Sequence, residues 1–112
     1  MSMKNLDVVH APTVSNLGGA IQVSTTVTDE QDTGVTSAKG PKQFNFVCNI
    51  DVYIIFAATS TITDIVIADY AGDERCFLIP ASTIVTFEVA ERSRYFVAIA
   101  GEDGVLRWYE DK

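Results

Sequence analysis

The sequence predicts an all-β protein: an antiparallel β-sandwich or jelly-roll-like domain with an extended N-terminal arm. β-branched and aromatic residues dominate every periodic segment, and turn residues separate these segments at short intervals. No stretch combines capping residues with the i, i+3, i+4, i+7 apolar spacing of an amphipathic helix. With 112 residues, of which 47% are hydrophobic and 21% charged, the chain has room for one folded domain. We therefore expect one core and almost no helix.

The composition changes at Pro41, which predicts two parts. All six Phe, all four Tyr and the single Trp follow this residue, whereas Ser, Thr, Gly and Asp are frequent before it. We expect an extended arm over residues 1–40 and a β-sandwich domain over residues 41–112. Within the arm, residues 20–28 favour a strand, but such a segment buries little surface alone. It should order by lying on this domain or on a neighbouring subunit; a flexible tail is the alternative.

After Pro41, alternation and short apolar runs mark the strands. In residues 42–48, Phe44, Phe46 and Cys48 share one side. In residues 83–89 the apolar inner side alternates with an outer side that carries Ile84. Strands are expected at residues 42–48, 52–57, 62–68, 76–79, 83–89, 95–100 and 105–110.

Two turns carry further expectations. Residues 80–82 (Pro-Ala-Ser) predict a corner, because proline removes a backbone donor and fixes its own φ. Residues 101–104 (Gly-Glu-Asp-Gly) fit a type I turn in which Gly104 takes a positive φ. The sequence thus predicts a hairpin between residues 95–100 and 105–110, the best defined in the chain.

No residue pattern predicts catalysis, a metal or a cofactor. His10 is the only histidine and stands among Ser and Thr residues, away from any metal-ligand spacing. The carboxylates near expected loops are better explained as solvated turn residues than as a catalytic pair, since so small a sandwich leaves little room for a cleft. Cys48 and Cys76 lie in apolar stretches, and we expect two buried free thiols rather than a disulfide.

Charge and hydropathy argue against nucleic-acid binding, export and membrane insertion. Fifteen acidic and eight basic residues give a net charge of −7, and the basic residues are scattered, so nucleic acid is not an expected partner. The N-terminal residues lack the apolar run of a signal peptide, and we expect no export. The longest apolar run, residues 52–58, is far shorter than the roughly 20 residues of a membrane span.

Several expected strands are apolar on both faces, although a sandwich needs only one apolar face per strand. The arm could cover the second face, or central strands could simply be more apolar than average. We favour a subunit interface, and with it a homo-oligomer, most simply a two-fold dimer. The candidate interface residues are Val8, Val9, Leu17, Ile21, Val23, Tyr53, Tyr95, Phe96 and Tyr109.

From Lys42 onward the chain resembles small structural proteins of tailed phages. The resemblance rests on the strand and corner of residues 77–82 (FLIPAS), on residues 85–89 (VTFEV) and 95–99 (YFVAI), and on a last strand starting at residues 104–106 (GVL). It departs from the family at Ser82, where the corner usually has glycine, and at residues 90–93, where a turn lacks one. These are packing and turn positions, so they concern fold more than role.

Size, arm and acidic charge look most similar to the jelly-roll-like decoration, or cement, proteins of icosahedral heads. This resemblance implies a non-enzymatic protein made in the host cytoplasm. It would lie on the outer capsid surface of the virion as a homo-oligomer and clamp major capsid protein subunits. A tail or head–tail joining subunit and a carbohydrate-binding virion module are the alternatives.

Overall fold

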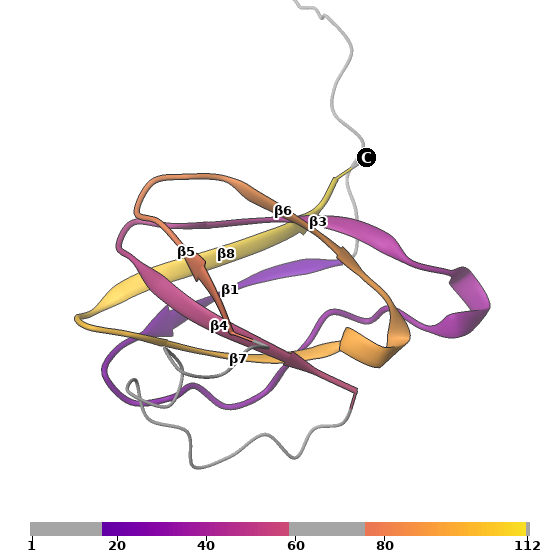
Figure 1. Cartoon of the computed structure of the whole chain (residues 1–112), viewed down its shortest axis with the longest axis horizontal. Helices are drawn as coiled ribbons and strands as arrows, with labels where there is room; N and C mark the ends of the chain where they lie inside the picture. Colours follow the sequence, from indigo (N-terminus) through magenta and orange to yellow (C-terminus); the bar gives the residue numbers. More distant parts are fainter. Residues whose placement is uncertain (1–16, 59–75, 112) are drawn as a thin grey trace, which may run out of the picture.

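The computed structural model describes residues 17–58 and 76–111, which form two antiparallel four-stranded sheets packed face to face (Figure 1). The first sheet, called sheet A, contains in spatial order β1 (Gly18–Val23), β8 (Gly104–Glu110), β3 (Lys42–Cys48) and β6 (Val85–Val89). The second, sheet B, contains β2 (Gln31–Asp32), β7 (Tyr95–Ala100), β4 (Val52–Ala57) and β5 (Cys76–Ile79). The helical segments of the described residues are two 3₁₀ turns, η1 (Ser37–Lys39) and η2 (Glu91–Ser93). The predicted all-β sandwich is confirmed; the strand expected at residues 62–68 lies outside the described residues.

The strand pairing follows the order of a jelly roll. β1 pairs with β8, β2 with β7, β3 with β6 and β4 with β5, as in one long antiparallel ribbon. Rolling that ribbon brings β8 beside β3 and β7 beside β4, which completes both sheets. Consecutive strands therefore mostly lie in opposite sheets, and the short links between them cross from one layer to the other (Figure 1).

The hairpin predicted around residues 101–104 is wrong, because β7 and β8 belong to different sheets. Both strands carry an apolar inner side, and placing them in opposite layers lets Phe96 and Trp108 meet across the core at 4.9 Å between ring centroids. Gly104 also lacks the predicted positive φ. Its small size matters instead, since a Cβ there would lie 2.5 Å from Cγ1 of Ile50.

The described part of the predicted arm, residues 17–40, belongs to the sandwich. β1 pairs along its whole length with β8, from Gly18 opposite Tyr109 to Val23 opposite Gly104. The chain then follows β7, where the Thr28 amide donates to the Ala98 carbonyl at 3.0 Å. The change of composition at Pro41 is therefore no structural boundary: this segment is ordered by backbone pairing, which needs few aromatic residues. Residues 1–16 lie outside the described part.

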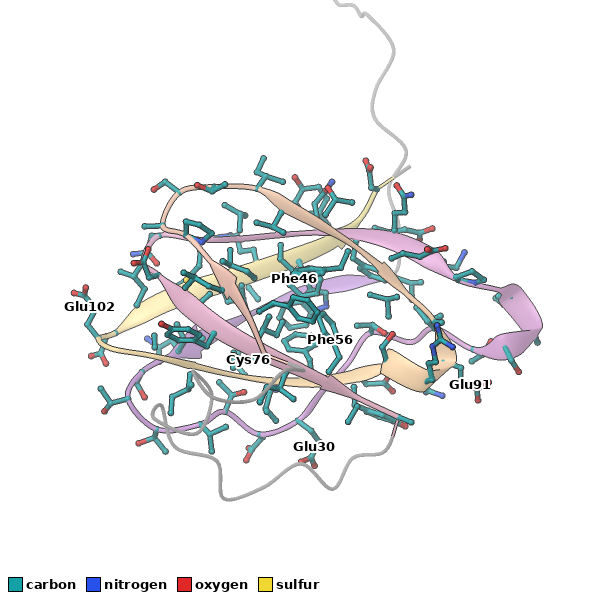
Figure 2. All side chains as sticks on the ribbon, viewed as in Figure 1. Glu30, Phe46, Phe56, Cys76, Glu91 and Glu102 are labelled. Carbon is teal, nitrogen blue, oxygen red and sulfur yellow. The ribbon has the colours of Figure 1, made fainter. Side chains whose placement is uncertain are left out.

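Aromatic side chains fill the space between the sheets. Phe44 and Phe46 of β3 are fully buried, as their alternation predicted, while Cys48 on the same side is 1% exposed. Phe46 meets Phe56 from the opposite sheet at 5.8 Å between ring centroids, in an edge-to-face arrangement (Figure 2). Filling of this kind leaves a packed interior, so functional features must be sought on the surface.

A second, smaller apolar cluster covers part of the outer face of sheet B. Ile55, Val97 and Ile99 point away from the main core yet are at most 1% exposed, and Val27 and Tyr53 pack against them. Val27 comes from the segment that follows β1. The second apolar face of β4 and β7 is thus covered in part by residues of the predicted arm, one of the explanations considered for it.

Candidate interaction surfaces

The structure separates the predicted interface residues into different environments. Val23 and Phe96 are core residues, 1% and 0% exposed, so they cannot contact a partner in the folded protein. Phe96 stands in a strand that is apolar on both faces, so its inward side was not distinguishable from the sequence alone. Leu17 and Ile21 are half-buried and pack against the main core. Val8 and Val9 lie outside the described residues.

The predicted interface tyrosines remain at the surface, but on opposite sides of the sandwich. Tyr53 and Tyr95 are half-buried on the outer face of sheet B, where the Arg94 guanidinium lies 5.2 Å from the centre of the Tyr95 ring. Tyr109 is 43% exposed on the outer face of sheet A, on the same side of β8 as Arg107. The structure therefore offers two separate surfaces in place of one interface.

Three further apolar side chains are well exposed. Leu78 on β5 stands opposite Tyr53 and is 47% exposed, while Ile84 just before β6 is 59% exposed. Phe77 is 44% exposed and touches Phe87 with 5.2 Å between ring centroids, where β5 of sheet B faces β6 of sheet A. The alternation of residues 83–89 indicated that Ile84 points outward. Leu78 and Phe77 carried no such signal, because their exposure depends on the position of β5 as the last strand of sheet B among the described residues.

The outer face of sheet A holds a shallow hollow of about 540 Å³. Val47, Ile84 and Val105 supply its apolar lining, and Arg107, Asn49 and Ser82 its polar groups. Asn49 is fixed in this place because its Oδ1 accepts the Val105 amide at 2.8 Å. Apolar side chains and hydrogen-bonding groups therefore lie side by side in this hollow, on one face of the sheet.

Ser82 has an unusual backbone at the rim of this hollow. Its φ is +59°, the left-handed region that glycine favours. The Thr83 amide donates to the Pro80 carbonyl at 3.2 Å, so Ser82 is the third residue of a four-residue turn and has the positive φ of a type II turn. The corner predicted at residues 80–82 is present, and its backbone shape accounts for a preference for glycine at this position.

An ion pair joins the segment before η1 to the start of β7. Arg94 donates from Nε to Oδ1 of Asp32 at 2.7 Å and from Nη2 to Oδ2 at 2.9 Å. The hydrogen bond from Arg94 lowers the pKa of the Asp32 carboxyl, and the pair raises the pKa of Arg94. Nearby, Glu91 accepts the Ser37 amide at 2.9 Å, and hydrogen bonding from Ser37 lowers the pKa of Glu91. The contact between Ser37 and Glu91 joins the two 3₁₀ turns, and the ion pair links β2 to the residue after the second of them.

The remaining chemistry-bearing side chains are dispersed. Across residues 17–58 and 76–111, no three His, Cys, Asp or Glu side chains lie close enough together to hold a metal ion. Cys48 and Cys76 are both free thiols, as expected, but only Cys48 is buried and Cys76 is half-buried. Trp108 is 5% exposed and packs in the core, so it has no open ring face for a sugar to stack on.

None of the helical segments in the described ranges has the length and apolarity to span a bilayer. The chain matches no known protein family, and neither a curated protein nor a solved structure shows significant similarity to it.

Proposed function

We propose that this protein decorates the outer surface of a phage head and stabilises contacts between major capsid protein subunits. The observation that carries the proposal is a small jelly-roll sandwich with exposed apolar side chains on both outer faces. Leu78 lies on sheet B, and Ile84 and Tyr109 lie on sheet A. Jelly rolls are common in viral capsids and also occur elsewhere, so the surface and not the fold must carry the function.

Its mode of action is binding, with no turnover. A protein that binds the assembled shell and not the separated subunits shifts the equilibrium towards the shell by mass action. Many copies on one particle multiply this effect, even when each contact is weak. The net charge of −7 fits a partner surface of protein better than one of packaged DNA, whose phosphates would repel it.

Two surfaces allow a division of roles within this function. One outer face would bind a second copy, and the other would bind the capsid. Tyr53 and Leu78 form an apolar pair on sheet B, which suits a two-fold contact between identical patches. The protein would thus lie on the virion as a homo-oligomer, most simply a dimer.

Co-sedimentation with heads and with tails, offered separately, tests the proposal. Purified protein is mixed with heads assembled from the capsid protein of the same virus, and bound copies per particle are counted by quantitative mass spectrometry. Saturable binding to heads and not to tails is the expected result. Saturable binding to tails alone, in a ring-like copy number, would instead support a tail or head–tail joining subunit and refute decoration.

A further inference from the structure

We propose that the hollow on the outer face of sheet A is the capsid-binding site, and that it receives a partner segment with one carboxylate flanked by apolar side chains. This inference rests on the proposed function. It assigns the contact to Arg107, Asn49 and Ser82, together with the apolar residues around them.

Arg107 is the centre of the argument because it is an exposed cation in an apolar setting. Its cross-strand neighbours are Ala20 on β1 and Val47 on β3, and Val105 and Tyr109 flank it on the same side of β8. Across residues 17–58 and 76–111, Arg107 forms no ion pair, although Lys42 and Arg94 each have a carboxylate partner. Its guanidinium can therefore bind a carboxylate from another protein, in bidentate geometry.

The polar groups of the hollow are donors. The Oδ1 atom of Asn49 is occupied by the Val105 amide, which leaves the side-chain NH₂ to donate. Neither this NH₂ nor the Ser82 hydroxyl has a hydrogen-bond partner among the described residues. Donors of this kind around one guanidinium complement an acceptor with negative charge. Ile84, 59% exposed, and Val105 on the same lining complement apolar side chains beside it.

Other occupants fit this surface less well. A two-fold contact centred on the hollow would bring two Arg107 side chains together, and like charges oppose that pairing. A small free anion would leave the apolar lining exposed. A phosphate backbone would meet a protein of net charge −7. A protein segment that carries one Asp or Glu between apolar residues can contact both the polar groups and the apolar lining of the hollow.

The test compares variants in the head co-sedimentation assay. Arg107→Glu should weaken binding by about 30-fold or more, as expected when one partner of a desolvated charge pair is reversed. Ile84→Gln should weaken it several-fold. The matched control is Arg92→Glu, which makes the same charge change on exposed η2. It should leave affinity within about twofold, since Arg92 does not line the hollow and an isolated exposed charge contributes little. Unchanged Trp108 emission and unfolding midpoint verify that each variant is folded.

The outcomes separate this inference from the proposed function. Wild type that binds heads, with Arg107→Glu impaired and Arg92→Glu intact, supports both. Equal binding by wild type and by the Arg107 and Ile84 variants overturns the site but leaves decoration standing. Failure of wild type to bind heads overturns both. If Arg107→Glu abolishes self-association and leaves head binding intact, the occupant is a second copy and the proposal is wrong.

Discussion

Asp32 and Arg94 form a bidentate ion pair that links β2 to the residue immediately before β7, with N–O distances of 2.7 and 2.9 Å. The two residues are 62 positions apart in sequence. β2 itself contributes only two residues to the ladder with β7. The ion pair therefore supplements a short strand with a side-chain contact at its end.

The lowered pKa of Asp32 predicts a stability loss in acid. A carboxyl whose pKa is depressed by folding contributes stability above its ordinary value of 3.8, and this contribution disappears as the pH falls through the folded pKa. Asp32→Asn should be less stable than wild type at pH 7, and the difference should shrink as the pH falls below 3.8 and vanish once the pH lies below the folded pKa of Asp32. Urea unfolding followed by Trp108 emission measures this difference. Asp29→Asn, at a carboxylate outside the ion pair, is the control and should match wild type throughout.

The positive φ of Ser82 predicts that glycine is the better residue there. A left-handed L-residue is strained by about 1–2 kcal/mol, and glycine avoids this strain at an entropic cost of about 0.5–1 kcal/mol. Ser82→Gly should therefore raise the free energy of unfolding by up to about 1 kcal/mol, whereas Ser82→Val should lower it, since β-branched residues resist this conformation. Equal stability of the two variants in chemical denaturation would contradict the assigned turn.

Gly19 must be glycine because of its contact with Trp108. A Cβ at Gly19 would lie 2.7 Å from Cζ2 of Trp108, and the ring is held in the core. Gly19→Ala should destabilise the protein by about 1–3 kcal/mol through overpacking. The control is Gly101→Ala, whose Cβ meets no atom within 4 Å and should cost far less. The urea unfolding midpoints of the two variants measure this difference. A Gly19→Ala midpoint equal to that of Gly101→Ala would show that β1 does not pack on Trp108.

The outer face of sheet B predicts the oligomer contact. Leu78 is exposed enough to accept a charge without loss of the fold, so Leu78→Glu should shift the protein from dimer to monomer by placing like charges across a two-fold axis. Gln22→Glu, which puts the same charge on the exposed side of sheet A, should leave the dimer intact. Sedimentation velocity over a range of concentrations measures both. A wild-type protein that stays monomeric throughout removes the basis for a dimer.

The positions of the strands could be predicted from the sequence better than the way in which the strands pair. Alternation fixed the inner side of β3 and β6, since one face of each is polar. It failed for β7, because a strand that is apolar on both faces carries no sign of which side is buried. Phe96 was therefore assigned to an interface although it lies in the core. The turn residues at 101–104 suggested a hairpin. Turn residues determine the backbone shape of the link, however, and not the sheet to which the next strand belongs.

The hollow was beyond prediction for a related reason. Arg107, Asn49 and Ser82 come from three separate parts of the chain, and only the pairing of β8 with β3 places the first two on one face. Ser82 did carry a signal, since the resemblance marked its position as one where glycine is usual. The pattern could not show that the backbone there keeps the glycine conformation.

The central claim, that this protein acts by stabilising a particle, is tested most directly by the temperature at which heads release their DNA. Heads lacking the protein are heated in the presence of a DNA-binding dye, with and without purified protein added back. Decorated heads should rupture at a higher temperature than bare ones, and Arg107→Glu at the same concentration should restore little of the difference. Identical rupture temperatures for bare and saturated heads would contradict the claim.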